Sequence, residues 1–203
     1  MVSIVVFEFG VMRCQPLRRA LYAYEEKMNQ SKQELKRDLV RVKEKLTHLN
    51  SDLTLYNQLF SDRENVQVLN SSGALVFHRF QQCLIDSIYM SISRLLDPAK
   101  TMGSKNLSFA HLASEFGLQD DTEVAEELAL AITQYQDSKL KDYRNKVLSH
   151  NDHKTEKLDF YPFNTMLITE LLHRFWKIVS LIEFKAGLVK ETYTMSLEVI
   201  FTG

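Results

Sequence analysis

The stretch LKRDLVRVKEKLTHLNSDLTLYNQLF, residues 35–60, decides the fold class of this chain. Its apolar side chains alternate spacings of four and three residues, at Leu35, Leu39, Val42, Leu46, Leu49, Leu53, Tyr56 and Phe60. That spacing predicts one long helix with an apolar face, and the charged residues between them fall on its other faces. A coiled-coil seam between chains is one interpretation. An intramolecular bundle is favoured, because more apolar helical segments follow at once.

Three later segments continue the helical pattern. The segment 65–96 is predicted to be a helix with a weak point at Gly73, and Asp97-Pro98 ends it. Its apolar stripe consists of Val66, Leu69, Val76, Phe77, Phe80, Leu84, Ile88, Ile92, Leu95 and Leu96. The segments 122–150 and 163–186 are the other long helices, and the last has its stripe at Phe163, Met166, Leu167, Leu171, Phe175, Ile178, Val179 and Ile182. The residues expected to begin or end helices are Ser108, Gly117, Asp120 with Glu123, and Gly187.

Composition supports one all-α domain. The chain has 203 residues, of which 45% are hydrophobic, and it contains only three Pro and six Gly. We therefore predict an up-and-down bundle of long antiparallel helices over residues 28–187. Residues 1–27 are an N-terminal extension, which is either an added strand or a segment ahead of a start at Met28. Residues 188–203 form a tail with strand-like alternation, and this tail is a candidate to pair with the N-terminal strand.

Cysteine use and hydropathy bear on the compartment. Cys83 lies within an apolar helical pattern, so a buried free thiol is expected there, as in proteins of a reducing compartment. The apolar residues 2–9 lack the basic leader and the cleavage site of a signal peptide. No run approaches the roughly 20 apolar residues that span a bilayer. We expect a cytoplasmic protein without a membrane partner.

The candidate active site is the stretch KLKDYRNKVLSHND, residues 139–152. Arg144 offers a planar fork of donors to a phosphate, Asn145 both donates and accepts hydrogen bonds, and His150 titrates near neutral pH. Lys141 and Lys146 are expected to contact RNA. The net charge of -1 excludes a strongly basic surface, so contact with nucleic acid must be local.

Spacing constrains how these residues can act together. Arg144 and His150 are six residues apart, so they lie about 120° apart around an ideal helix. For both to reach one phosphate, the helix must end or distort near His150, or two chains must each contribute residues across a two-fold axis. A homodimer with its axis near His150 is therefore predicted. Cleavage of RNA without a metal needs a base, an acid and a cation, which His150 and Arg144 can supply.

Other interpretations of the polar residues carry less weight. His150, Asp152 and His153 do not make a convincing metal site, because no cysteine or second spaced cluster accompanies them. We predict neither a metal nor a cofactor. Arg94 and Asp97 are either neighbours of the catalytic residues or, as favoured here, an intrahelical pair that shapes the helix end.

Several motifs together resemble those of a known family. The stretch from Arg144 to His150 is similar to the Arg-(four to six residues)-His signature of HEPN domains, in which a polar residue commonly follows the Arg. Its companions are SRLLDP at 93–98, NLS at 106–108, YRNK at 143–146 and HND at 150–152, in the order of the abortive-infection U-like (AbiU-like) branch. The resemblance covers roughly residues 32–182.

The resemblance implies a dimeric helical bundle in which two Arg-His motifs form one cleft. It also implies a metal-independent endoribonuclease that acts in bacterial phage defence or as a toxin, with an antitoxin or a defence protein as a further partner. Some members of the family bind RNA without cutting it, so a non-catalytic RNA- or protein-binding bundle is the alternative. Some HEPN toxins carry a modifiable Tyr two residues after the His. That position is Asp152 here, so control through such a Tyr is not expected.

Overall fold

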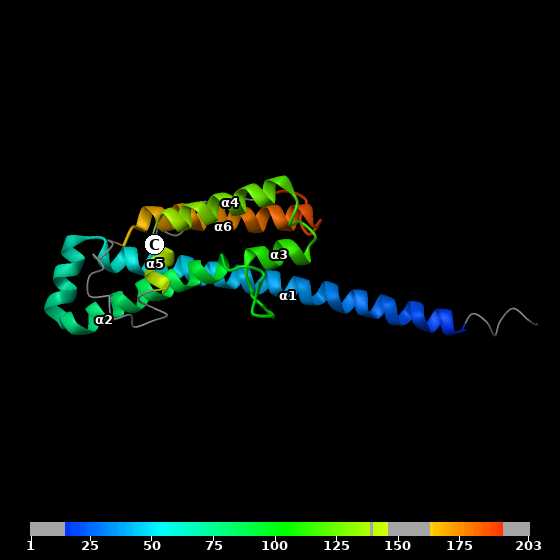
Figure 1. Cartoon of the computed structure of the whole chain (residues 1–203). Helices are drawn as coiled ribbons and strands as arrows, with labels where there is room; N and C mark the ends of the chain where they lie inside the picture. Colours follow the sequence, from blue (N-terminus) through cyan, green and yellow to red (C-terminus); the bar gives the residue numbers. More distant parts are fainter. Residues whose placement is uncertain (1–14, 139, 146–162, 193–203) are drawn as a thin grey trace, which may run out of the picture. The chain divides into compact units, whose positions relative to one another are not determined.

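The described part of the chain is a helical bundle. The computed structural model describes residues 15–138, 140–145 and 163–192. Its helices are α1 (Gln15–Phe60), α2 (Arg63–Leu95), α3 (Phe109–Glu115), α4 (Thr122–Asp137), α5 (Leu140–Tyr143) and α6 (Thr165–Lys185) (Figure 1). A two-stranded antiparallel hairpin, β1 (Lys100–Thr101) and β2 (Ser104–Lys105), follows α2. The all-α fold class is therefore confirmed. Both predicted terminal strands lie outside the described residues.

The described residues fall into two compact units, with the boundary between Arg37 and Asp38. Within the first unit the chain is helical from Gln15 onward, so the first helix begins earlier than the predicted residue 30. The core and the candidate site belong to the second unit. Among the described helices, none combines the length and the apolar character that crossing a membrane requires.

The long helices of the second unit pair in antiparallel fashion. From α1 to α2, Asp52 accepts a hydrogen bond from Ser87 at 2.7 Å. Nearer the turn between these helices, Gln81 donates to the Tyr56 hydroxyl at 3.4 Å. The contact with the higher residue number in α1 thus has the lower residue number in α2, as antiparallel neighbours require. The same order relates α4 to α6, because Gln134 pairs with Glu170 and Asp121 with Lys185.

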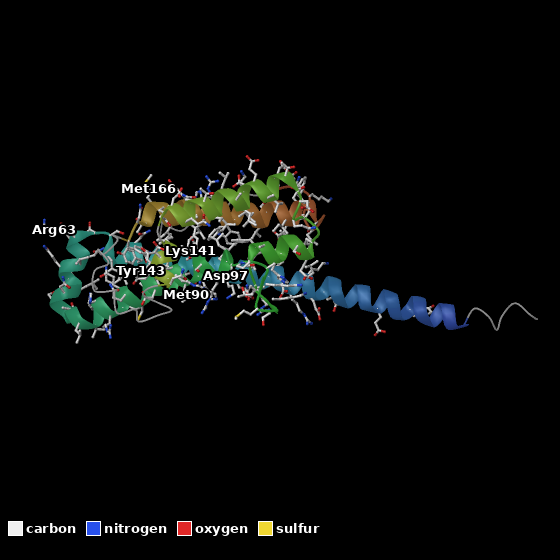
Figure 2. The ribbon with its side chains drawn as sticks, viewed as in Figure 1. Arg63, Met90, Asp97, Lys141, Tyr143 and Met166 are labelled. Carbon is white, nitrogen blue, oxygen red and sulfur yellow. The ribbon has the colours of Figure 1, made fainter. Side chains whose placement is uncertain are left out.

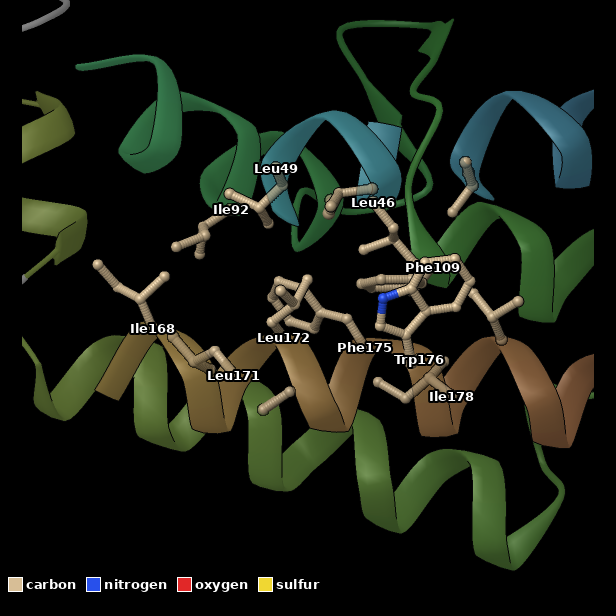
Figure 3. Packing of buried hydrophobic residues seen from close by; sticks show 14 of the residues in the cluster. Leu46, Leu49, Ile92, Phe109, Ile168, Leu171, Leu172, Phe175, Trp176 and Ile178 are labelled. Carbon is tan, nitrogen blue, oxygen red and sulfur yellow. The ribbon is translucent and has the colours of Figure 1, made fainter. Parts of the chain in front are cut away.

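The core forms where the apolar faces of α1, α2, α3 and α6 meet. Figure 3 shows Leu172 and Phe175 of α6 lying between the α6 ribbon and Leu46 and Leu49 of α1. The ring of Phe109 in α3 lies 5.0 Å from that of Phe175, and both side chains are fully buried. The predicted stripes of α1 and α6 thus supply a large share of the core, and burial of such apolar area is the main stabilising term.

Capping side chains fix where the helices begin and end. Ser108 caps α3 as predicted, and its hydroxyl accepts from the backbone N–H of His111. The cap of α4 is Asp121, one residue after the predicted Asp120, because its carboxylate accepts from Val124 N–H. Gly187 follows α6 with φ +69°, a left-handed conformation that favours glycine.

Three predictions about burial are wrong. The apolar side chains in the first part of α2 do not form core, since Val76 and Phe80 are 69% and 40% exposed. Cys83 is exposed rather than buried. The backbone is non-helical at Gly73, where the α2 ribbon bends in Figure 1, so the apolar residues next to this bend do not continue the buried face. Cys83 directly precedes Leu84 and so lies about 100° around the helix from it. Buried residues of α2 begin only at Leu84. In α6, Met166 is likewise exposed, near the start of the helix.

Candidate active site

The predicted continuous helix 122–150 is broken at Ser138, and that break shapes the site. The Ser138 hydroxyl donates to the carbonyl of Tyr135 at 2.6 Å and accepts from the N–H of Leu140 at 3.4 Å. A serine that bonds to nearby backbone in this way competes with helical hydrogen bonds. The chain therefore leaves α4 at Asp137 and starts the short helix α5 at Leu140, whose side chain is buried.

Aromatic packing and one hydrogen bond hold α5 against α2. The Tyr143 hydroxyl donates to Asp86 Oδ1 at 3.1 Å, and its ring meets Tyr89 edge-on at a centroid distance of 5.0 Å. Phe163 in turn packs against the rings of Tyr89 and Tyr56. Burial, with the Asp86 carboxylate adding to it, raises the pKa of Tyr143 to about 12. Tyr143 is therefore a neutral anchor at physiological pH, directly before Arg144.

Arg144 and Asn145 continue α5 in a π-helical conformation. Such distortions inside helices are frequent at functional sites. Arg144 Nη1 donates to Asn145 Oδ1 at 3.1 Å, and Nη2 lies 3.9 Å from Asp97 Oδ1. The Arg144 side chain is 33% exposed, although its Nε is shielded from solvent and has no hydrogen-bond partner among the described residues. One end of the guanidinium can thus reach an anionic ligand in solution.

A buried hydroxyl pair lies beside this guanidinium. The Tyr135 hydroxyl of α4 donates to Ser93 Oγ of α2 at 3.1 Å, and both residues are buried. Burial raises the pKa of Tyr135; its bond to Ser93 and the positive charge of Arg144 act in the opposite direction, while Asp97 adds to the increase. The site is therefore assembled from the end of α2, from α4 and from the turn after α5. Figure 2 labels Asp97, Lys141 and Tyr143 within it.

The structure brings together two of the predicted catalytic residues and leaves the third undescribed. Arg144 and Asn145 are in contact, whereas His150 lies outside the described residues, as does Lys146. Lys141 is exposed on α5. The alternative metal ligands, Asp152 and His153 with His150, also lie outside. Within residues 15–138, 140–145 and 163–192, no cluster of three side chains suited to a metal ion occurs.

Sequence reasoning missed the residues that surround Arg144. Asp97 was favoured as a partner of Arg94, but the ion pair that the structure records for it reaches Arg144. Arg94 is exposed. Tyr135 was not singled out, and its helical spacing alone gave no sign of a polar contact with Ser93. The one available signal was the Asp97-Pro98 pair itself, which places a carboxylate at a fixed helix end.

Comparison with known proteins gives one result. The family model HEPN_AbiU2, described as AbiU2, matches residues 32–191. No curated protein and no solved structure matches the chain. The matched range takes in α2, α4, α5 and α6 and every described residue of the site. It also agrees with the range of roughly 32–182 over which the sequence motifs resemble this branch. The chain therefore belongs to the AbiU2 family of HEPN domains, a family related to abortive infection.

Proposed function

We propose that this protein is a metal-independent endoribonuclease of the HEPN type that acts in phage defence, as an abortive-infection protein or a toxin. The observation that carries the proposal is the partly exposed Arg144 guanidinium, which is held by Asn145 in a distorted helical turn. Membership of the AbiU2 family supports it, and so does the position of His150 six residues further on.

The proposed reaction starts with the 2′-hydroxyl of the RNA. His150 takes the proton from this hydroxyl, and the 2′-oxygen attacks the adjacent phosphorus. The bond from phosphorus to the 5′-oxygen breaks, and a histidine returns a proton to that oxygen. The products are a 2′,3′-cyclic phosphate and a free 5′-hydroxyl. Arg144 stabilises the charge that builds up on the phosphoryl oxygens, because its planar fork can donate to two of them at once.

The residues around the arginine take supporting roles in this proposal. Asn145 accepts from Nη1 and thereby limits rotation of the guanidinium. Lys141, exposed on the same short helix, is available to the RNA backbone, where each neutralised phosphate adds salt-dependent affinity. Lys146 is assigned the same contact from its place in the sequence. We also propose a homodimer whose two-fold axis passes near His150, so that the motifs of two chains form one cleft.

The decisive experiment incubates purified protein with mixed RNA in excess chelator and compares it with Arg144→Lys and His150→Ala. We expect the wild type to cleave and to leave cyclic phosphate ends. Loss of the planar fork should lower the activity of Arg144→Lys by roughly 100-fold or more. His150→Ala should bind RNA without cutting it. Arg174→Lys is the matched control, because Arg174 lies on α6 and forms its ion pair with Glu127 of α4, and lysine keeps the positive charge.

Two outcomes would reject this assignment. If RNA with a 2′-methoxy group at the cut site is cleaved normally, the 2′-hydroxyl is not the nucleophile. If the wild type binds RNA with an affinity that depends on Arg144 but never cleaves it, the protein is the non-catalytic binding bundle instead.

A further inference from the structure

We propose that Asp97 is a positioning residue for Arg144, one that orients the guanidinium from across the helix interface without touching the RNA. This inference rests on the proposed function, since it assigns a role within the same site. It comes from the contact between Asp97 Oδ1 and Arg144 Nη2 at 3.9 Å, which links the end of α2 to the turn after α5.

The backbone that carries Asp97 is held firmly on both sides. Before it, the N–H of Leu96 bonds to the carbonyls of Ile92 and Ser93 and so closes α2. After it, the side-chain amide of Asn106 donates to the carbonyl of Pro98 at 2.7 Å. The backbone N–H of Asn106 also donates to Ala99 at 2.9 Å. A carboxylate on such a fixed segment can hold a partner in one place, because little of its own backbone freedom remains to be lost.

Arg144, in contrast, depends on its neighbours for orientation. Asn145 supplies one hydrogen bond, to Nη1, and comes from the adjacent residue, so it moves with the same turn. Nε has no hydrogen-bond partner among the described residues. Among the carboxylates of the described residues, that of Asp97 forms an ion pair with Arg144. The opposite effects of Arg144 and Asp97 on the pKa of Tyr135 agree that both charges lie close to this buried hydroxyl.

The long separation suits a positioning role. At 3.9 Å the pair is beyond ordinary hydrogen-bond distance, so Nη2 keeps its donors available for a phosphate while the charges still attract. The same carboxylate repels a bound phosphate. Removing its charge should therefore lower kcat, through loss of orientation, without raising KM. Damage to the fold or loss of a direct RNA contact would instead raise KM or reduce the amount of folded protein.

The test compares Asp97→Asn, Asp97→Glu and Asp142→Asn by kcat and KM for RNA cleavage in chelator. Asp142→Asn is the matched control, since Asp142 is exposed on α5 and the same charge is lost near Arg144. We expect Asp97→Asn to reduce kcat roughly 10- to 100-fold with KM unchanged or lower. Asp97→Glu should keep most of the activity and Asp142→Asn nearly all of it. A wild-type kcat in Asp97→Asn overturns the inference, and so does an equal effect in the control.

A second measurement decides the inference even if the protein does not cleave RNA. The side-chain Nε–H of Arg144 is shielded from solvent, so its nuclear magnetic resonance signal should exchange slowly with water in the wild type and in Asp142→Asn. The signal is assigned by its loss in Arg144→Lys. It should be lost to fast exchange in Asp97→Asn, while the circular dichroism spectrum shows an intact fold. An unchanged signal in Asp97→Asn refutes the positioning role. Absence of cleavage by the wild type refutes only the ribonuclease proposal.

Discussion

The bond between Tyr143 and Asp86 offers a direct test of how α5, and with it Arg144, is fixed. Tyr143→Phe removes one hydroxyl and leaves the ring, which packs 5.0 Å from Tyr89. The variant therefore loses the 3.1 Å hydrogen bond and little else. Both partners are partly exposed, so water can replace the hydroxyl at the Asp86 carboxylate.

The expected cost follows from that partial exposure. A hydrogen bond to a charged group contributes roughly 1.5–3 kcal/mol when it is sheltered, and less when water competes for the acceptor. We expect Tyr143→Phe to lower the free energy of unfolding by about 1 kcal/mol, against a typical total of roughly 5–15 kcal/mol. In a double-mutant cycle with Asp86→Ala, the coupling energy should be about 0.5–1 kcal/mol.

Alkaline pH should also change the difference in stability between the wild type and Tyr143→Phe. The folded pKa of Tyr143 is about 12, above the ordinary value of about 10 for an unfolded chain. The stability that neutral Tyr143 contributes is complete below pH about 10 and is lost as the pH rises from about 10 to about 12. The wild type should therefore lose stability more steeply through this range than Tyr143→Phe does.

Urea denaturation followed by circular dichroism, at pH 7 and at several values between about 9.5 and 11, measures both effects. Tyr22→Phe is the control, because Tyr22 is 68% exposed and the same hydroxyl is removed. It should match the wild type throughout. Additive effects of Tyr143→Phe and Asp86→Ala, together with parallel pH curves, would show that the hydroxyl does not anchor α5.

Three other perturbations test the core, the helix ends and the assembly. Phe175→Ala should lower the free energy of unfolding by about 3–5 kcal/mol, because the side chain is fully buried in the core; a loss below about 1 kcal/mol in urea titration would contradict that packing. Gly187→Ala should lower the free energy of unfolding by about 1–2 kcal/mol, since φ is +69°. Gly73→Ala should lower it less, because an added Cβ there meets only ordinary contact. Thermal melts that rank the two variants in reverse order would be inconsistent with these backbone angles. The wild type should sediment as a homodimer, and a strictly monomeric active protein would disprove the proposed two-fold site. When Arg144→Ala and His150→Ala chains are mixed, recovered RNA cleavage would show that the Arg and His of one site come from different chains, and no recovery that they come from the same chain.

Much of the fold was predictable because burial follows helical periodicity. The stripe from Leu39 to Tyr56 is buried as the spacing of four and three required, and the α6 stripe from Leu171 to Ile182 is buried in the same way. Local chemistry also located Ser108 as a cap. Periodicity failed in the first part of α2, since it reports only that one face is apolar and not whether another helix lies opposite. Whether the apolar face in the first part of α2 meets another helix depends on the bend at Gly73.

The site was predictable only in part. The fork of Arg144 and the amide of Asn145 are local in sequence, so residue chemistry alone could pair them. The break at Ser138 could not be foreseen, because serine is tolerated inside helices. Which backbone group its hydroxyl bonds to is fixed only in the folded chain. The contact of Asp97 with Arg144 depends on tertiary packing, which no spacing rule reaches.

The assembly of the site from three separate segments has a consequence for synthesis on the ribosome. Asp97 and Tyr135 emerge before Arg144, and α6, which supplies fully buried core residues and pairs with α4, emerges after all of them. A growing chain therefore holds the site's parts without the packing that fixes them. If the protein does cut RNA, we expect this activity to appear only once α6 has docked. The ribosome and the transcript that make the protein would then not be cut while translation is under way.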